Sequence, residues 1–268
     1  MHLLDAVQAP GHWRTVDFIS DLHLQASEPA TFESWRTYMQ HASCDALFIL
    51  GDLFEVWVGD DLLDAPTEEA AFPQACVQAL HAATQRMPVY FMAGNRDFLV
   101  GKRLLAATGM QGLSDPCTLT LGNERWVLSH GDALCLGDTD YQTFRRQVRA
   151  PSWQAQFLAQ PLSQRLAVAR QIRMASEQRK GTDTPWADAD PGASTLLLQR
   201  HGAIRLVHGH THQAADHPLG EGGQRCVLSD WDATSSPPRL EVLRWAAPAA
   251  GATQQPPRRF SIKMAPSA

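Results

Sequence analysis

Five short polar clusters in this chain each follow an apolar run that is predicted to form a β-strand. They are Asp21-Leu-His23, Gly51-Asp52, Gly94-Asn-Arg-Asp97, His130-Gly-Asp132 and Gly209-His-Thr-His212. In layered α/β folds, ligands bind at the carboxyl ends of the strands. We therefore expect these five segments, which lie far apart in the sequence, to bring carboxylate, amide and imidazole groups to one edge of a sheet.

The predicted strands alternate with predicted helices, and this order favours an α/β fold built in layers. Apolar runs typical of strands cover residues 16–19, 46–50, 89–92, 126–128, 204–207, 225–228 and 240–245. Helical patterns cover residues 30–41, 67–86 and 102–108. Residues 119–128 have the pattern of a hairpin that turns at Gly122-Asn123.

Residues 139–201 break this alternation, because they contain no predicted strand. They read as several helices separated near Pro151, Pro161 and Pro185. The last residues of the chain are rich in Ala, Pro and Gly. We therefore expect a core of residues 14–138 and 202–246, an inserted helical cap of residues 139–201, and a disordered tail of residues 247–268.

The predicted cap is both basic and apolar. Its basic residues between positions 141 and 180 are Arg145, Arg146, Arg149, Arg165, Arg170, Arg173, Arg179 and Lys180, and the only acidic residue there is Glu177. A surface of this kind suits an anionic lipid substrate or an anionic membrane face. A helical subdomain that buries its own apolar side and turns its arginines to water would have the same pattern. Both interpretations remain open at this point.

The bulk composition excludes some classes of protein. With 44% hydrophobic residues the chain can bury a core, and its net charge of −5 argues against a general nucleic-acid binder. The five cysteines form no C-x-x-C pair, which favours reduced thiols over a disulfide framework. We expect neither a signal peptide nor a transmembrane segment, because the longest apolar run, residues 46–50, is too short to cross a bilayer.

Each polar cluster alone has an ordinary explanation. Asp-x-His can be a helix cap beside a surface histidine, Gly-Asp is often a turn, and a histidine such as His130 can be a hydrogen-bonded core residue. All five clusters in one order, each at a strand end, favour a metal centre instead. Its expected ligands are Asp21, His23, Asp52, Asn95, His130, His210 and His212.

The types of ligand define the chemistry of this expected centre. Carboxylate, imidazole and amide donors without thiolate fit Mn²⁺, and Fe²⁺ or Zn²⁺ are also possible. Two ions about 3.5–4 Å apart need a bridging carboxylate, and Asp52 is the lone carboxylate of its cluster. One ion would bind Asp21, His23 and His212, and the other would bind Asn95, His130 and His210.

These motifs resemble the calcineurin-like metallophosphoesterases and, within them, the UDP-2,3-diacylglucosamine diphosphatases. The resemblance runs from about Thr15 to Trp245 and rests on Ile49-Leu-Gly-Asp-Leu-Phe-Glu55, Val58-Gly-Asp-Asp61, Gly94-Asn-Arg-Asp-Phe-Leu99, Gly101-Lys-Arg103 and His208-Gly-His-Thr-His212. It implies an αββα sandwich with an inserted helical cap. It also implies two Mn²⁺ ions per chain and a metal-activated water.

The same resemblance implies a substrate and a place of action. The substrate would be UDP-2,3-diacylglucosamine, cut at its pyrophosphate bond to UMP and 2,3-diacylglucosamine 1-phosphate (lipid X) in lipid A biosynthesis. The enzyme would be peripheral on the cytoplasmic face of the inner membrane, with the cap sheltering the acyl chains. No nucleic acid and no protein partner is implied. The resemblance favours the substrate-cap interpretation of residues 139–201.

Arg96 points independently to a diphosphate substrate. Broad phosphoesterases of this class have a histidine after Gly-Asn that protonates an alkoxide leaving group, whereas this chain has Arg96. Arginine stays charged and cannot act as a general acid. A phosphate leaving group, whose second pKa is about 6, needs no proton donor but gains from a bidentate guanidinium. Alternatively, Arg96 merely pairs with Asp97 or Asp132.

The resemblance assigns the catalytic group to Asp52, Asn95, Arg96 and His130. It assigns substrate contacts to Asn95, Arg96, Asp138, Ser176, Lys180 and His210. Around the cap the chain departs from the family, because Lys180 and Asp183 stand where related enzymes offer an asparagine and then a lysine. Asp132 either orients a ligand histidine or supports a turn.

Two other kinds of function are compatible with the same fold. Another metallophosphoesterase, such as a cyclic-nucleotide phosphodiesterase or a dinucleoside polyphosphate hydrolase, would not need the apolar cap. A non-catalytic scaffold of the same fold would be expected to lose ligands, whereas all seven positions are filled here.

Overall fold

The computed structural model of the chain describes residues 3–65, 68–180, 188–249 and 251–262, and for residues 68–69 and 173–180 it describes the helix but not the side chains. Its strands are β1 Leu4–Gln8, β2 Thr15–Ile19, β3 Ala46–Leu50, β4 Val89–Met92, β5 Gln111–Leu121, β6 Glu124–Leu128, β7 Arg205–His208, β8 Ala215–Pro218, β9 Gln224–Val227, β10 Glu241–Ala246 and β11 Arg258–Ser261. Its helices are α1 Pro29–His41, α2 Glu68–Thr84, α3 Lys102–Thr108, α4 Thr139–Val148, α5 Pro151–Leu158, α6 Leu162–Lys180 and α7 Pro191–His201, with short 3₁₀ turns η1 Asp60–Asp64, η2 Asp132–Leu134 and η3 Gly220–Gly222.

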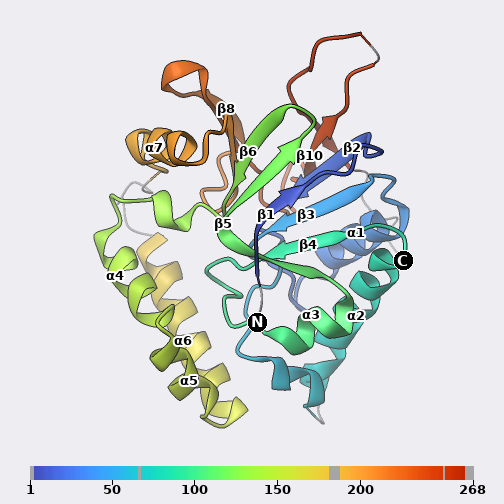
Figure 1. The fold of residues 1–268 in the computed structure, drawn as a ribbon. Helices are drawn as coiled ribbons and strands as arrows, with labels where there is room; N and C mark the ends of the chain where they lie inside the picture. Colours follow the sequence, from blue (N-terminus) through green and yellow to red (C-terminus); the bar gives the residue numbers. More distant parts are fainter. Residues whose placement is uncertain (1–2, 66–67, 181–187, 250, 263–268) are drawn as a thin grey trace.

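The strands form one curled sheet in the order β11-β10-β2-β3-β4-β5-β6-β7-β9-β8, and β1 pairs with β5 outside this path (Figure 1). Strands β2, β3, β4 and β5 are parallel neighbours, and β6, β7 and β9 form a second parallel run. The antiparallel β5–β6 hairpin joins the two runs. Parallel neighbours end at the same edge of the sheet, so their polar clusters can meet there.

The curled sheet encloses one core between its two halves. In β3, Ala46, Phe48 and Leu50 face a cluster that also contains Trp126 of β6 and Val207 of β7. Successive side chains of a strand point to opposite faces. The whole of β3 is apolar because both of its faces are buried.

The outer faces of both sheet halves are covered by helices. Leu47 and Ile49 pack into a second cluster with Trp35 of α1 and Leu80 of α2. On the other side, Leu198 of α7 packs with Val127 and Leu206. Helix, sheet, sheet and helix therefore follow one another, and the predicted αββα fold is confirmed.

The helices α4, α5 and α6 lie together on one side of the molecule, at the left of Figure 1. Two of the expected breaks are present, because α5 begins at Pro151 and α6 begins directly after Pro161, while Pro185 lies outside the described residues. The arginines of this segment do not all face water. Arg165 of α6 is 1% exposed, donates to the carbonyl oxygen of Val58 and pairs with Asp61 of η1.

The structure differs from the expected boundaries at both ends of the chain. Residues 4–8, which we placed in no element, form β1 and pair in parallel with β5. Residues 258–261 of the expected disordered tail form β11, which pairs antiparallel with β10. The partner of β1 is distant in the sequence, and a loop separates β11 from its partner β10. The sequences of β1 and β11 themselves carry little strand signal. Among the described helices, none combines the length and the apolar character that crossing a bilayer requires.

Candidate metal centre

The structure brings the seven expected ligands to one edge of the curled sheet. Asp21 and His23 follow β2, Asp52 follows β3, and Asn95 follows β4. His130 follows β6, while His210 and His212 follow β7. Within each parallel run the strands end together. The two runs meet along β5, where Met92 of β4 pairs with Leu113 and Leu128 of β6 pairs with Cys117.

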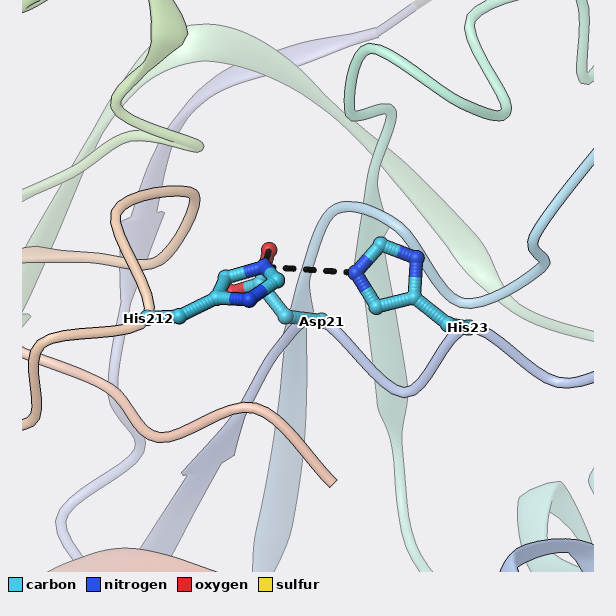
Figure 2. Close-up of side chains that lie close together, drawn as sticks. All are labelled: Asp21, His23 and His212. Carbon is cyan, nitrogen blue, oxygen red and sulfur yellow. Dashed lines mark hydrogen bonds and ion pairs between the residues drawn. The ribbon is translucent and has the colours of Figure 1, made fainter. Parts of the chain in front are cut away.

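The first group of ligands consists of Asp21, His23 and His212 (Figure 2). Nε2 of His212 lies 3.4 Å from Oδ1 of Asp21. Nε2 of His23 lies 3.3 Å from Nε2 of His212. One ligand atom from each of the three residues falls within 4.8 Å of the others, which is close enough for a shared ion.

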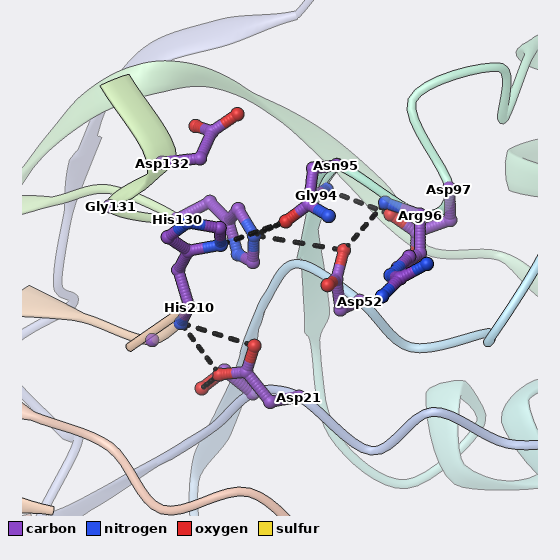
Figure 3. A network of polar contacts seen from close by, with 12 residues as sticks. Asp21, Asp52, Gly94, Asn95, Arg96, Asp97, His130, Gly131, Asp132 and His210 are labelled. Atoms are coloured by element: carbon purple, nitrogen blue, oxygen red, sulfur yellow. Dashed lines mark hydrogen bonds and ion pairs between the residues drawn. The ribbon is translucent and has the colours of Figure 1, made fainter. Parts of the chain in front are cut away.

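The second group gathers around the amide of Asn95 (Figure 3). Its Oδ1 lies 2.8 Å from Nε2 of His130 and 2.9 Å from Nδ1 of His210. Figure 3 shows His130 and His210 approaching this oxygen together. The three residues expected to share the second ion are therefore in contact with one another.

Asp52 lies between the two groups. Its Oδ1 is 3.7 Å from Nε2 of His130, and its Oδ2 is 4.0 Å from Nε2 of His23. This position suits the bridging role expected for Asp52. Asp21 also forms a close set with Asp52 and His130, so its carboxylate is not confined to the first group.

The backbone is strained at this edge. Among the described residues, six that are not glycine have a positive φ, and five of them are expected ligands. They are Asp21 (53°), His23 (47°), Asp52 (53°), His210 (67°) and His212 (56°). A left-handed conformation costs most residues of order 1–3 kcal/mol and tends to persist at functional sites. The fold therefore holds these side chains in place at a cost to its own stability.

Two glycines let the ligand loops approach closely. A Cβ atom on Gly94 would collide with Oδ1 of Asp52, and one on Gly209 would collide with Oδ2 of Asp21. Because each glycine lies directly before a ligand, Asn95 or His210, the loops can pack against the two carboxylates. Any larger residue at either position would push a carboxylate away.

The buried charges of the site act strongly on one another. Burial alone would raise the pKa of Asp21, but the hydrogen bond and charge of His212 hold it well below its usual range. Burial alone would lower the pKa of His130, but the charges of Asp52 and Asp21 raise it to about 9. Burial and the charge of His130 lower the pKa of His210 to about 3. The carboxylates of Asp52 and Asp21 thus favour a positive charge at His130, whereas His210 is held neutral.

The arrangement of the imidazoles fits a bound cation. Nδ1 of His23 lies 2.9 Å from Oε2 of Glu55, and Nδ1 of His212 lies 3.7 Å from Oδ2 of Asp230. With the protons on these Nδ1 atoms, the two Nε2 lone pairs face each other at 3.3 Å. A divalent ion between them would convert this repulsion into coordination.

Glu55 and Asp230 are carboxylates that lie beside expected ligands and to which our prediction gave no role. Glu55 stands in a motif that we quoted but to which we gave no role. Asp230 follows β9 after two residues, so the rule used for the five clusters would have found it. His130 is oriented differently, because its Nδ1 lies 3.0 Å from the carbonyl oxygen of Leu50.

Arg96 pairs with neither of the two aspartates that we considered. Its NH1 lies 3.7 Å from Oε1 of Glu55, and its backbone N–H donates to Oδ1 of Asp52 over 2.8 Å. The buried carboxylate of Asp97 instead accepts hydrogen bonds from the backbone N–H groups of Leu53 and Gly94. The guanidinium of Arg96 therefore stays beside the two groups of ligands.

The structure places the other predicted substrate contacts less centrally. Asp138 is the N-cap of α4, where its Oδ1 accepts from the backbone N–H of Tyr141 over 3.0 Å. Ser176 and Lys180 lie on α6, but their side chains are outside the described residues.

An apolar pocket lies between the ligand loops and the cap. Asn95, Arg96 and Glu55 line its polar end. The rest of its wall comes from the loop before η1, from the loop between β4 and α3, and from the cap. It includes Trp57, Phe98, Phe144, Trp153, Phe157 and Ile172. The pocket therefore joins charged groups at the strand ends to an apolar space under the cap.

Comparison with known proteins agrees with this geometry. The sequence model of the family described as calcineurin-like phosphoesterase matches residues 14–214. A UDP-2,3-diacylglucosamine hydrolase of Xanthomonas axonopodis pv. citri is 45% identical over 242 residues, which cover 85% of this chain and 96% of the relative. One of Chromohalobacter salexigens is 40% identical over 251 residues, which cover 87% and 99%.

Among solved structures, a Vps29 variant of Entamoeba histolytica matches with a TM-score of 0.45 and 14% identity, over 87% of this chain and 86% of that chain.

Proposed function

Because the chain belongs to the calcineurin-like phosphoesterase family, we propose that it hydrolyses the pyrophosphate bond of UDP-2,3-diacylglucosamine to UMP and 2,3-diacylglucosamine 1-phosphate. The observation that carries this proposal is the apolar pocket beside the ligand groups, since the substrate has acyl chains next to a diphosphate. The relatives of that name cover most of this chain, which supports the same substrate.

The reaction needs a nucleophile and neutralisation of charge. Asp21, His23 and His212 would hold one divalent ion, and Asn95, His130 and His210 the other, with Asp52 between them. Bound ions supply a water of lowered pKa and offset the charge of the phosphate oxygens. We propose two Mn²⁺ per chain, which the carboxylate, imidazole and amide donors suit.

The remaining steps fall to side chains of this chain. The oxygen of water joins one phosphorus atom while the bond from that phosphorus to the bridging oxygen breaks, and the bridging oxygen leaves on the second phosphate. That phosphate needs no proton donor near neutral pH, because its second pKa is about 6. The guanidinium of Arg96, which lies beside Glu55 and lines the pocket, would stabilise the charge that gathers there.

The cap helices would cover the acyl chains. Phe144, Trp153 and Phe157 line the pocket from α4 and α5, and together with Arg96 they would hold the apolar and the anionic parts of one substrate. Asp138, Ser176 and Lys180 would contact the sugar or its phosphate. Association with the cytoplasmic face of an inner membrane would follow from the lipid nature of this substrate.

The test compares an acylated with an unacylated substrate. The purified protein with Mn²⁺ would be assayed for UMP release from UDP-2,3-diacylglucosamine and, in parallel, from UDP-N-acetylglucosamine. We expect release from the acylated compound alone and no release after EDTA treatment. Release from both compounds would remove the role of the acyl pocket, and release from neither would overturn the proposed substrate.

A further inference from the structure

Two side chains of α4 and that of its C-cap residue lie on one face of the helix and meet the same buried carboxylate. Tyr141, Arg145 and Arg149 are spaced by four residues, so they follow one another along that face. Oδ2 of Asp132 accepts hydrogen bonds from the hydroxyl of Tyr141 over 2.6 Å and from Nε of Arg145 over 2.8 Å. NH2 of Arg149 lies 3.7 Å from the same oxygen.

Asp132 connects this face directly to a ligand loop. It lies two residues after His130 and is fully buried. Its own backbone carbonyl oxygen accepts from Nε2 of Gln142 of α4 over 2.7 Å. Asp132 does not orient the ring of His130 itself, whose Nδ1 faces Leu50. The polar contacts of Asp132 therefore connect the loop of His130 to α4 of the cap.

The same helix face reaches two further ligand loops. The ring of Tyr141 stacks on that of His210, with centroids 5.8 Å apart and planes 29° apart. NH2 of Arg149 donates over 2.8 Å to the carbonyl oxygen of Gly94, directly before Asn95. The three loops that carry Asn95, His130 and His210 are thus each in contact with α4 or its C-cap.

We infer that Asp132 is a positioning residue that holds α4 against the loops of Asn95, His130 and His210. The packing of the cap against these loops and the geometry of the second metal position would then depend on each other. A buried carboxylate is stable only while its cationic partners remain in place. Withdrawal of α4 would leave Asp132 unpaired beside His130 and would release Gly94 and His210 from their contacts. This inference rests on the proposed metal centre.

The test separates this role from plain support of the fold. Asp132→Asn removes the charge, and Arg145→Met removes one cation at similar size from a partly exposed position outside the ligand groups. Arg145→Lys keeps the charge, and Asp140→Asn is a matched acidic control on the exposed side of α4. Mn²⁺ affinity of the metal-depleted full chain is measured by isothermal titration calorimetry, together with kcat, KM and melting temperature.

We expect Mn²⁺ binding to weaken about tenfold or more in Asp132→Asn and Arg145→Met, as is usual when a partner outside the coordination shell is lost. The fall in activity should lie in kcat more than in KM. Arg145→Lys should recover most of the affinity, and Asp140→Asn should match the native chain. Native Mn²⁺ affinity in Asp132→Asn and Arg145→Met, with only a lower melting temperature, would overturn the inference. If the unsubstituted chain bound Mn²⁺ but did not hydrolyse UDP-2,3-diacylglucosamine, the proposed function would be overturned instead.

Discussion

The carboxylate of Glu55 lies 2.9 Å from Nδ1 of His23, and its second oxygen lies 3.7 Å from the guanidinium of Arg96. One buried side chain thus faces both an expected metal ligand and the arginine proposed to stabilise the leaving phosphate. Carboxylates that face a ligand histidine fix its tautomer and raise its basicity.

We therefore predict that Glu55→Gln lowers metal affinity or turnover about 10–100-fold. Glutamine keeps the size of the side chain but loses the negative charge that holds the Nδ1 proton of His23. Mn²⁺ titration and steady-state kinetics would measure the two effects. Glu33→Gln, which removes an exposed ion pair with Arg36 on α1, is the control and should leave both unchanged. Native values in Glu55→Gln would contradict the role of Glu55.

Asp52 lies between both groups of ligands, and its replacement should therefore affect both ions. We predict that Asp52→Ala reduces UMP release to background while the chain stays folded, because the removal of a buried negative charge offsets the lost contacts. Activity assays and circular dichroism would check this. Asp64→Ala, at an exposed ion pair with Arg103, serves as control. An Asp52→Ala variant that kept most of its turnover would exclude a two-metal mechanism.

Arg96 is proposed to act on the leaving phosphate without holding a metal. We predict that Arg96→Ala lowers kcat by about 10²–10³-fold, the usual effect of removing one group that stabilises developing charge. Its metal content, measured by atomic absorption, should stay native. Arg96→Lys should recover part of kcat, because an ammonium keeps the charge but not the bidentate geometry. Loss of bound metal in Arg96→Ala would assign Arg96 a structural role.

Asp61 and Arg165 join η1 to the cap, and this link should depend on pH. The hydrogen bond and charge of Arg165 lower the pKa of Asp61 against a smaller opposing effect of burial. A carboxylate whose pKa is lowered by folding stabilises the fold above its ordinary pKa, near 3.9, and this contribution disappears as the pH falls through the lower folded value. Protonated Asp61 would leave the buried guanidinium of Arg165 without its counter-charge.

We therefore predict that the melting temperature of the native chain falls in acid more steeply than that of Asp61→Asn. Scans from about pH 7 to about pH 2 would compare the two variants. At neutral pH, Asp61→Asn should melt at a lower temperature than the native chain. Parallel curves for the two variants over the whole range would show that the pair contributes nothing to stability.

The sequence was sufficient to predict the parts of the fold whose signal is local. Residues 46–50 and 89–92 are apolar throughout because both of their faces are buried, and the structure has β3 and β4 at those positions. Helix α3 likewise occupies residues 102–108, followed by Gly109 in a left-handed conformation as its C-cap. Parallel topology explains why the polar clusters meet within each of the two parallel runs. That the two runs meet each other depends on the path of β5, which the sequence alone did not reveal.

Other features depend on contacts between distant segments. Glu55 reaches His23 because a β-bridge between Leu24 and Phe54 aligns their two loops, and no local pattern encodes this bridge. Strand β1 has a mostly exposed burial pattern, and it forms only because β5 offers a partner more than a hundred residues later. The contacts of α4 with Asp132 likewise could not be predicted, because they depend on how the cap is oriented and amino-acid composition does not determine that orientation.

Arg259 of β11 ties together the two ends of the curled sheet. Its guanidinium donates to the carbonyl oxygens of Ala215 of β8 and Val227 of β9, and it pairs with Asp216 and Glu241. The strands β11 and β8 stand at opposite ends of the strand order, so this side chain closes the sheet. It also holds β8, which follows the loop of His212, and β9, which precedes the loop of Asp230.

We predict that Arg259→Ala lowers the free energy of unfolding by about 1.5–3 kcal/mol, the usual contribution of hydrogen bonds to a charged group. Urea unfolding followed by circular dichroism would measure it. Arg258→Ala, at the exposed neighbouring position of β11, is the matched control and should change stability by less than about 0.5 kcal/mol. Because β11 would then leave the sheet edge more easily, proteolysis near the carboxyl terminus should also become faster in Arg259→Ala. Equal stability of the two variants would show that the closing contact contributes nothing and that β11 is held by its pairing with β10 alone.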